Sequence, residues 1–430
     1  MRKYTLEKYS LQGAGVTIYR EIVPDDQTKP ILLTIGKIRK DALCASCNHV
    51  TDYHYDTRPT ASTIRHLDYH DRHVHLLLRK RRFKCLACEK VFTEEFPKLV
   101  KPNGRKTISF NHAALASLKT HNFKDTQTKF NVSFSYLKNQ LYDLVDHESS
   151  AIDWEKEFSD NETISIGIDE HSHKKKRLVL TIANLTKKKL ITIRPAYTQV
   201  ELAMFLRSIP RQFRKRIAYA ATDLTNRYGK IIKQWLPNVT ISADCFHVVR
   251  LLNNLLWQEK RVLEGVYRMH TIKYFKLLLK GEERLKDWQR EKVDEILKVK
   301  KYGRLKMAYE LKEQIRWIVN KDTEKKIAKQ EFIRVAHSDV WNSMNRIEDR
   351  RELLKYSKYY RTCIETLQNW EQEIITLIET RITNGYTEGI HTKIKLLKRM
   401  SYGISNPTTY IKRMILAFSD DFLPDSFHYV

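Results

Sequence analysis

The first hundred residues show the alternation of apolar and polar positions that is typical of β-strands. Such runs occupy residues 15–23 (GVTIYREIV), 30–38 (PILLTIGKI) and 73–85 (HVHLLLRKRRFKC). Between about residues 105 and 148 the apolar spacing becomes helical, with polar breaks near Asn122 and Ser133. The pattern therefore predicts a β-rich region over residues 1–100 and a helical region over residues 101–150.

From residue 163 onward, strand patterns alternate with helix patterns. TISIGID, RLVLTIANL and LITIRP predict three strands, and QVELAMFLRSI predicts a helix that stops at Pro210. RIAYAATD predicts a fourth strand, NRYGKIIKQWL a helix ended by Pro237, and VTISAD a fifth strand. This order predicts an α/β unit with a mixed sheet. The same connectivity occurs in the ribonuclease H-like fold, which is an argument by analogy.

The chain after the fifth strand is helical in pattern, rich in Lys, Glu and Leu, and almost free of Gly and Pro. A further helix, NGYTEGIHTKIKLLKRMSYG, opens at Asn384-Gly385 and closes at Gly403. We therefore expect a ribonuclease H-like core in two parts, residues 160–250 and 381–430, interrupted by an all-helical insertion over residues 251–380. The whole is predicted to be a multidomain α+β protein. We expect at least three of the insertion's five tryptophans to be core residues: Trp257, Trp288, Trp317, Trp341 and Trp370.

Four of the six cysteines form two close pairs, Cys44-x-x-Cys47 and Cys85-x-x-Cys88. Four thiolates are enough to enclose one tetrahedral zinc ion, and they leave no open position for a substrate. The pairs therefore predict a zinc ribbon with structural Zn²⁺, and the gap between them has room for a β-hairpin. Two alternatives are cysteines without a metal and a ligand supplied by one of the histidines between the pairs.

Charge points to the kind of partner. The 430 residues contain 78 Lys and Arg against 51 Asp and Glu, a net charge of +27. Such a surplus favours nucleic acid over a merely solvated basic surface. Beside the second cysteine pair, a basic patch suited to phosphates contains Arg79, Arg81 and Arg82. Residues 125–145 fit a helix-turn-helix whose second helix, with Ser135, Lys138 and Asn139, would face DNA, although any small helical hairpin has the same pattern.

The sequence gives no sign of a membrane protein. It contains no apolar run of the ~18–20 residues that cross a bilayer, and MRKYTLEKYS lacks the apolar part of a secretory signal. We therefore expect a cytoplasmic protein whose cysteines stay reduced.

Three acidic residues occupy the places that two-metal phosphoryl transfer requires in a ribonuclease H-like sheet. Asp169 follows ISIGI on the first strand, Asp223 ends the fourth strand, and Glu388 lies in the later helix. Carboxylates from separate elements can hold a pair of Mg²⁺ (or Mn²⁺) ions. On the helix of Glu388, Lys395 and Arg399 share one face with the acid by helical spacing, where they would bind the DNA backbone.

Three strings resemble the ISL-type family of bacterial insertion-sequence transposases: IGIDE, DLTNRYGKIIKQWLPNVTISADCFHVVRLLN and NGYTEGIHTKIKLLKRMSYG. The resemblance covers the cysteine ribbon and residues 163–415. It implies a DDE transposase with catalytic residues Asp169, Asp223 and Glu388. Such an enzyme cuts double-stranded DNA at the ends of its own element and joins the 3′ ends to target DNA. Because two ends must be joined together, we expect a homodimer or larger assembly on DNA, located at the bacterial nucleoid.

A different residue is an alternative to Asp223 as the second acid of the triad. Asp244, in ADCFHVV, is equally conspicuous, but strand order favours Asp223 because Asp244 ends the fifth strand. Asp244 with His247 resembles the Cys/Asp-x-x-His motif of mutator-like transposases, which accompanies the acidic triad in an accessory role. Two other functions also fit: a DNA-binding regulator without catalysis, and a two-metal nuclease that cuts without joining.

Overall fold

The computed structural model describes residues 6–56, 60–150, 152–158, 163–174, 177–196, 199–224, 226–266, 271–338 and 358–419. The chain divides into two compact units. Unit 1 contains Met1–Ser150, Met400–Tyr402 and Leu416–Val430, and unit 2 contains Ala151–Arg399 and Gly403–Ile415. The finer domain boundaries given above stay predictions.

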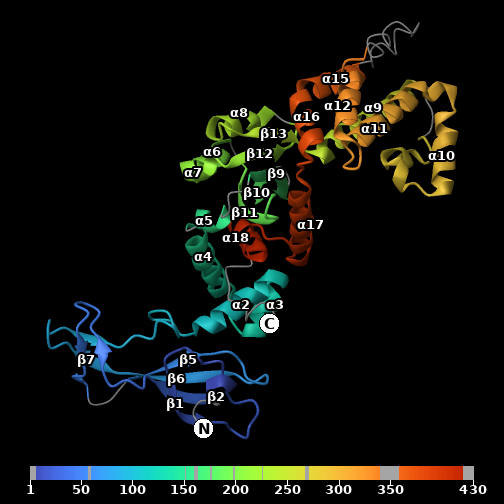
Figure 1. Cartoon of the computed structure of the whole chain (residues 1–430). Coiled ribbons are helices and arrows are strands. Elements are labelled where there is room, and N and C mark those ends of the chain that lie inside the picture. Colours follow the sequence, from blue (N-terminus) through green and yellow to red (C-terminus); the bar gives the residue numbers. More distant parts are fainter. Residues whose placement is uncertain are drawn as a thin grey trace. The chain divides into compact units, whose positions relative to one another are not determined.

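Unit 1 begins with a four-stranded sheet of order β1-β2-β6-β5 (Figure 1). Its strands are β1 (Thr17–Ile22), β2 (Ile31–Gly36), β5 (Thr60–Arg65) and β6 (Val74–Lys80). The predicted strands are thus confirmed. β5 and β6 form an antiparallel hairpin between the cysteine pairs, and β6 runs parallel to β2. The segment between the pairs therefore shares one apolar core with the N-terminal strands, formed by residues such as Leu33, Ile35, Leu76 and Leu78.

Each cysteine pair lies at a short hairpin, β3 (Ala42–Leu43) with β4 (Val50–Thr51), and β7 (Arg82–Lys84) with β8 (Val91–Thr93). Three helices follow: α2 (Ile108–Thr120), α3 (Phe123–Phe130) and α4 (Phe134–Ser150). The polar residues predicted to interrupt the helical region, Asn122 and Ser133, lie at the starts of two helices. Asn122 accepts a hydrogen bond from the Asp125 amide at the start of α3, and Ser133 accepts one from the Tyr136 amide at the start of α4. Such side chains satisfy amides that a helix leaves unpaired.

Unit 2 contains a five-stranded mixed sheet of order β11-β10-β9-β12-β13. Its strands are β9 (Ile164–Lys174), β10 (Arg177–Asn184), β11 (Lys189–Pro195), β12 (Ile217–Thr222) and β13 (Thr240–Ala243). β9, β10 and β11 are antiparallel neighbours, whereas β12 runs parallel to both β9 and β13. The predicted mixed α/β sheet is confirmed.

The two faces of this sheet carry different helices. α6 (Gln199–Ser208) and α8 (Asn226–Trp235) cover one face, where Ile166 and Ile168 of β9 pack with Phe205 and Ile232. α17 (Gly385–Met400) and α18 (Pro407–Phe418) cover the other face (Figure 1). The short helices α5 (Trp154–Glu157) and α7 (Arg211–Arg214) complete this part. Because side chains alternate along a strand, the odd-numbered positions 167, 169 and 171 of β9 face α17 and α18.

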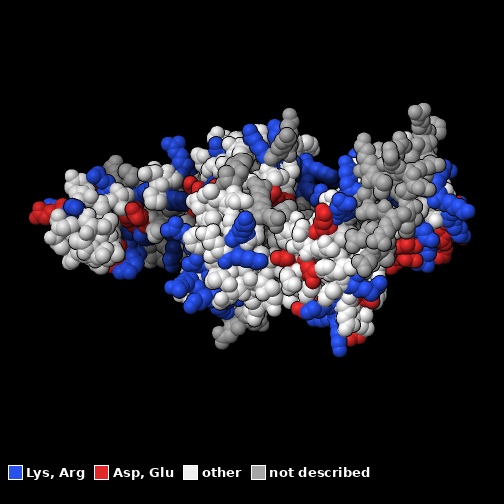
Figure 2. All heavy atoms as spheres, turned by 90° about the horizontal axis from the view of Figure 1, so that it is seen from above, with Lys and Arg blue, Asp and Glu red and all other residues white. Residues whose placement is uncertain are grey.

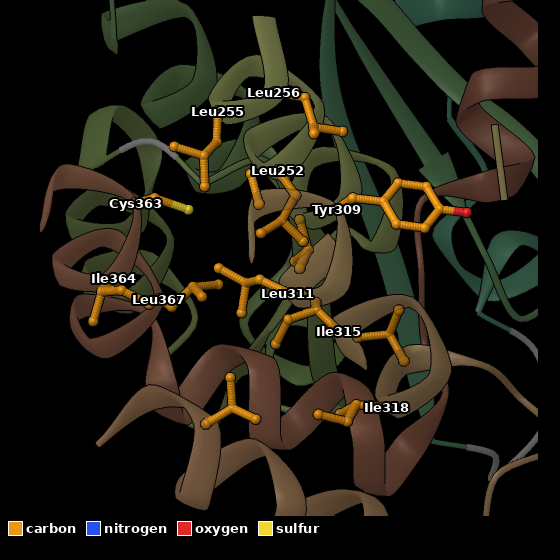
Figure 3. Packing of buried hydrophobic residues seen from close by; sticks show 14 of the residues in the cluster. Leu252, Leu255, Leu256, Tyr309, Leu311, Ile315, Ile318, Cys363, Ile364 and Leu367 are labelled. Carbon is orange, nitrogen blue, oxygen red and sulfur yellow. The ribbon is translucent and has the colours of Figure 1, made fainter. Parts of the chain in front are cut away.

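Between β13 and α17 the described residues are helical, as predicted. The helices are α9 (Cys245–Val266), α10 (Asp287–Leu297), α11 (Gly303–Val319), α12 (Lys325–Ala336), α15 (Lys358–Asn369) and α16 (Glu371–Thr380), with short 3₁₀ turns at Phe275–Leu279, Glu282–Arg284 and Lys300–Tyr302. Leu252 and Leu256 of α9 pack with Leu311 and Ile315 of α11 and with Leu367 of α15 (Figure 3). This helical part therefore has an apolar core of its own.

The expectation for the tryptophans was wrong. Trp370 is buried, but Trp257, Trp288 and Trp317 are 38%, 52% and 48% exposed, and Trp341 lies outside the described residues. A large ring with a polar edge fits the boundary of a helical core as well as its centre. As for membranes, none of the helices in the described ranges is long and apolar enough to cross one.

Candidate active site and zinc site

The four paired cysteines come together in unit 1. The Sγ atoms of Cys44, Cys47, Cys85 and Cys88 all lie within 4.8 Å of one another, with 3.7 Å between Cys44 and Cys88 and 3.5 Å between Cys47 and Cys85. Tetrahedral zinc bonded to four sulfurs at 2.3 Å requires sulfur separations of about 3.8 Å. The cysteine set therefore fits a structural zinc ion without a histidine ligand.

The basic patch beside the second pair is partly paired within unit 1. Arg81 donates two hydrogen bonds to the buried carboxylate of Glu94, at 2.9 and 2.8 Å, and Arg82 lies 3.1 Å from Asp56. Arg79 lies over the Tyr19 ring and lines a cavity of about 510 Å³. On α4, Lys138 lies over the Tyr142 ring. Arg81 and Arg82 thus have structural partners, whereas no carboxylate contacts Arg79 in the described residues. Figure 2 shows many Lys and Arg side chains on one face of the molecule.

Strand register sets three aspartates in one row. Gly167 of β9 pairs with Ala221 of β12, and Ala221 pairs with Ser242 of β13. Paired residues of parallel strands project to the same face, and so do residues two positions further along. Moving two residues along each strand gives Asp169, Asp223 and Asp244. The backbone of Asp223, directly after β12, therefore lies between those of the other two, and the residue is half-buried.

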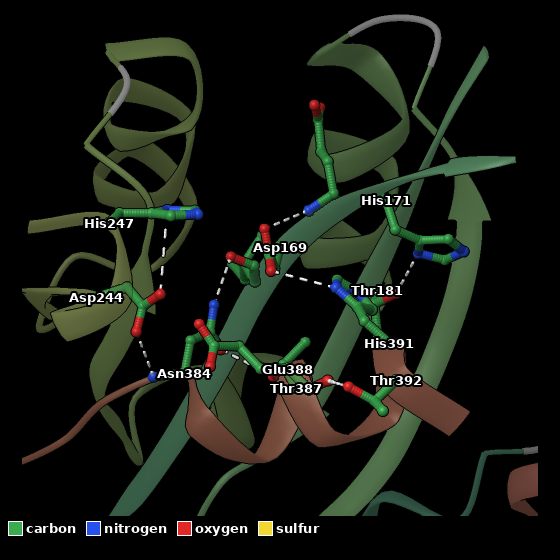
Figure 4. A network of polar contacts seen from close by, with 12 residues as sticks. Asp169, His171, Thr181, Asp244, His247, Asn384, Thr387, Glu388, His391 and Thr392 are labelled. Atoms are coloured by element: carbon green, nitrogen blue, oxygen red, sulfur yellow. Dashed lines mark hydrogen bonds and ion pairs between the residues drawn. The ribbon is translucent and has the colours of Figure 1, made fainter. Parts of the chain in front are cut away.

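Glu388 is brought to this row by the start of α17. Asn384 accepts a hydrogen bond from the Glu388 amide at 3.0 Å and donates one to the Ile168 carbonyl of β9, also at 3.0 Å. The Asn384 side-chain oxygen accepts a hydrogen bond from Thr387 Oγ1 at 2.8 Å. These contacts fix the first turn of α17 against the strand that carries Asp169, and Figure 4 shows Asp169, Asp244 and Glu388 around one small region.

Burial and the charges of neighbouring acids raise the pKa of two of the acidic residues. Burial, followed by repulsion from Asp244 and Asp169, raises the pKa of Glu388 to about 7. Burial also raises the pKa of Asp244. Asp244 Oδ2 and Glu388 Oε1 are buried and have no hydrogen-bond partner. Unpaired carboxylate oxygens beside other carboxylates are suited to a divalent cation, which neutralises the charges and accepts oxygen ligands. Within the described residues, however, the four cysteines are the only set of three or more His, Cys, Asp or Glu side chains whose ligand atoms lie close enough together to hold one ion, so the acids are more widely spaced.

Asp244 also joins the two ends of the helical segment. Its Oδ1 atom accepts hydrogen bonds from Thr383 Oγ1 at 2.8 Å and from the Asn384 amide at 3.1 Å. Its Oδ2 atom lies 4.0 Å from His247 Nδ1, beyond hydrogen-bonding distance, and this histidine nitrogen is also buried without a partner. Asp244 therefore hydrogen-bonds to the residues before α17 and makes only a long ion-pair contact with His247.

Sequence reasoning missed His391. Its Nδ1 atom lies 3.3 Å from Asp169 Oδ2, and its position one turn after Glu388 directs both side chains toward the sheet. Burial alone would raise the pKa of Asp169, but the hydrogen bond from His391 lowers this pKa below its usual value. A signal was present, because residues three apart on a helix share a face. The neighbouring Glu170 points to the opposite face, where it accepts a hydrogen bond from Tyr228 of α8.

Lys395 and Arg399, further along α17, are both exposed. Lys395 is close enough to Glu388 for its charge to oppose the rise in the pKa of that acid. The exposed side of α17 thus carries positive charge next to the acidic site.

A Cys₄ cluster that fits zinc, a mixed α/β sheet with clustered acids, and a helical segment inserted after its last strand define an α/β protein with a zinc-ribbon-like N-terminal part. A family model of ISL3 transposases matches residues 166–414, and a model of the zinc-finger of transposase IS204/IS1001/IS1096/IS1165 matches residues 40–88. The first match spans more than half of the chain, so the chain belongs to the ISL3 transposase family. The resemblance inferred from the sequence is thus confirmed.

Two relatives are similar over different lengths. The transposase for insertion sequence element IS1557 of Mycobacterium tuberculosis is 24% identical over 285 residues, which cover 59% of this chain and 60% of that protein. The chain thus matches about 60% of the length of this relative. The transposase for insertion sequence element IS1001 of Bordetella parapertussis is 22% identical over 418 residues, which cover 95% of this chain and 96% of that protein.

Proposed function

We propose that this protein is a DDE transposase that binds the ends of its insertion sequence, cleaves DNA, and joins the 3′ ends to target DNA by two-metal-ion phosphoryl transfer. The observation that carries the proposal is the group of acids at one sheet face, half-buried except for the fully buried Asp244, with orphaned carboxylate oxygens on Asp244 and Glu388, in a chain of a transposase family. A solvated surface would not concentrate acids in this way, because burying unpaired carboxylates is costly.

The strand order supports a ribonuclease H-like core. Three antiparallel strands followed by two parallel ones, with the first strand in the centre, is the arrangement of that fold. In it, Asp169 lies on the first strand, Asp223 follows the fourth, and Glu388 lies on a later helix, with the helical insertion between the fifth strand and that helix. This comparison of architectures is an analogy.

We assign Asp169, Asp223 and Glu388 as the residues that would hold Mg²⁺ or Mn²⁺. A metal pair would activate the attacking oxygen and stabilise the leaving oxygen. Because the pKa of Glu388 is raised to about 7, this carboxyl group holds a proton in part of the molecules at neutral pH. It must lose that proton to act as a metal ligand. Lys395 and Arg399 would hold DNA phosphates along α17. Asp244 and His247 are assigned accessory roles because Asp244 ends the fifth strand rather than the fourth, and its Oδ1 atom binds Thr383 and the Asn384 amide.

DNA recognition is assigned to unit 1. The zinc ion would make the ribbon rigid, so that Arg79, with Arg81 and Arg82, presents positive charge to phosphates. The turn at Asn131, between α3 and α4, suits a helix-turn-helix whose second helix carries Lys138. Joining two DNA ends calls for at least two copies of the chain.

The test is a Mg²⁺-dependent cleavage and strand-transfer assay on DNA from the ends of the element. We expect Asp169→Asn, Asp223→Asn and Glu388→Gln each to lower cleavage by at least about 10³-fold, because a metal ion contributes several kcal/mol to the transition state. Asp244→Asn keeps an acceptor oxygen for Thr383 and Asn384, so we expect a loss below about tenfold.

Each outcome selects one interpretation. Equal losses for Asp244→Asn and Asp223→Asn, with folding intact by circular dichroism, would make Asp244 a metal ligand. Cleavage without joining would identify a nuclease. Sequence-specific DNA binding that is unchanged in all acid variants, without cleavage, would identify a regulator.

A further inference from the structure

A chain of four buried polar side chains leads away from Asp169 to α18, and Figure 4 shows its first three members, His391, Thr181 and His171. His391 Nδ1 lies 3.3 Å from Asp169 Oδ2, and His391 Nε2 lies 3.0 Å from Thr181 Oγ1 of β10. Thr181 Oγ1 lies 3.2 Å from His171 Nδ1, and His171 Nε2 lies 3.1 Å from the Tyr410 hydroxyl. Thr181 is the residue paired with Asp169 across the sheet, so the chain starts beside that acid.

With both imidazoles neutral, counting hydrogens gives this chain a single direction. An ionised Asp169 can only accept, so His391 carries its hydrogen on Nδ1 and its Nε2 accepts from the Thr181 hydroxyl. Thr181 has then used its only hydrogen and must accept from His171 Nδ1–H. His171 Nε2 in turn accepts from the Tyr410 hydroxyl. With both imidazoles neutral, each of the four contacts has one donor and one acceptor.

We propose that His391, Thr181, His171 and Tyr410 are positioning residues that fix the Asp169 carboxylate for metal binding. Asp169 Oδ1 already accepts a hydrogen bond from the Glu170 amide at 2.7 Å. With His391 on Oδ2, both carboxylate oxygens are held, and each keeps a lone pair for a cation. The proposal rests on the function proposed above, since it assumes that Asp169 is a metal ligand.

The same contacts tie the acids to each other. His391 lies one turn after Glu388 on α17. The hydrogen bond that orients Asp169 therefore also fixes the position of Glu388 along β9. A metal ligand oriented by a second residue binds its ion more tightly, and removal of such a residue typically costs 10–100-fold in metal affinity.

His173 provides a matched control on the same strand face. It is buried, packs on the Tyr410 ring at 4.2 Å between centroids, and its Nε2 donates to the Ile404 carbonyl at 2.8 Å. Its Nδ1 atom has no partner, so it does not connect Asp169 to α18. Replacement of His173 therefore removes packing and one hydrogen bond without interrupting the chain.

The first experiment measures Mn²⁺ binding to the full-length, zinc-loaded protein by electron paramagnetic resonance of free Mn²⁺, which requires no DNA cleavage. We expect His391→Leu to weaken Mn²⁺ binding at least about tenfold and Thr181→Val to weaken it less. His391→Asn keeps a donor near the position of Nδ1 and should stay within about threefold of the wild type. His173→Phe should lower thermal stability but leave Mn²⁺ affinity unchanged.

The outcomes separate the two proposals. Equal Mn²⁺ affinity in His391→Leu and wild type overturns the positioning role, as does an equal loss in His173→Phe. If Asp169→Asn leaves Mn²⁺ binding unchanged, the proposed metal site fails instead. A second measurement tests the direction of the chain: ¹⁵N spectra of the wild type should show His391 and His171 both protonated on Nδ1, and Nε2–H on either ring would refute it.

Discussion

Gly167 allows α17 to approach the sheet, and its replacement by alanine would test the geometry of the acidic site. A Cβ at this position would lie 2.6 Å from Thr387 Oγ1, 2.9 Å from Leu185 Cδ2, and closer still to Asn384 Oδ1. Thr387 bonds to Asn384, and Asn384 bonds to β9, so the two side chains cannot turn away separately. The first turn of α17 must therefore move, by roughly 1 Å if normal contact distances are to be restored.

That movement has a cost in stability and in activity. Overpacking of this kind costs about 1–3 kcal/mol, which corresponds to a drop of roughly 2–10 °C in melting temperature for a unit of this size. Because Glu388 moves with the turn, we expect DNA cleavage to fall by about 10²-fold, the loss associated with a 1 Å misplacement of catalytic groups.

The assay is thermal denaturation together with cleavage of element-end DNA, with Gly389→Ala as the matched control. Gly389 follows Glu388 directly, and a Cβ there would meet nothing within 4 Å. Alanine inside a helix is favoured over glycine, so this variant should be stabilised by about 0.5–1 kcal/mol and stay active. If Gly167→Ala melts and cleaves like the wild type, the close packing of α17 on β9 is incorrect.

Three further predictions concern other parts of the molecule. Cys85→Ser should lower the zinc content per chain and expose the residues between the cysteine pairs to proteolysis; unchanged zinc stoichiometry by mass spectrometry would contradict the Cys₄ site. Burial lowers the pKa of His66 in the folded chain. As the pH falls below about 6.5, the unfolded chain therefore takes up a proton first. The contribution of His66 to folding stability is complete above this pH and is lost below it. His66→Gln should therefore flatten the melting profile between about pH 7 and 5. Glu259→Ala leaves the largely buried Arg304 without its 2.8 Å ion pair and should lower the free energy of unfolding in urea by about 3–5 kcal/mol, whereas a change below about 1 kcal/mol would show that solvent compensates.

The sequence alone was sufficient for most strands and helices of the core. The spacing of apolar residues identifies a helix or strand wherever one of its faces is buried, as in β9. A helix-breaking residue such as Pro210 or Gly403 marks where a helix ends. The cysteine pairs were equally readable because their ligand spacing is local. The acids could be named because strand order determines which strand ends are neighbours, although the choice between Asp223 and Asp244 stays a prediction.

Contacts between distant residues could not be read in this way. His391 and Thr181 are 210 positions apart, and Asp244 and Asn384 are 140 apart, so no local pattern shows that they meet. The sequence also did not show which group Arg81 binds. It was predicted to be one of several cations that bind phosphate, but its side chain binds the buried Glu94. Packing of one specific pair depends on the final three-dimensional arrangement rather than on residue type.

The contacts of β13 with the residues before α17 mean that the helical excursion leaves and re-enters the core at nearly one point. Ser242 Oγ donates to the Ile382 carbonyl at 2.7 Å, and Asp244 binds the next two residues. The distance between the exit and the return is thus set by the core. Helices in between can gain turns, lose them or be exchanged during evolution while the spacing of the acids stays constant. Under the proposed function, one catalytic core would in this way acquire new surfaces for different DNA ends.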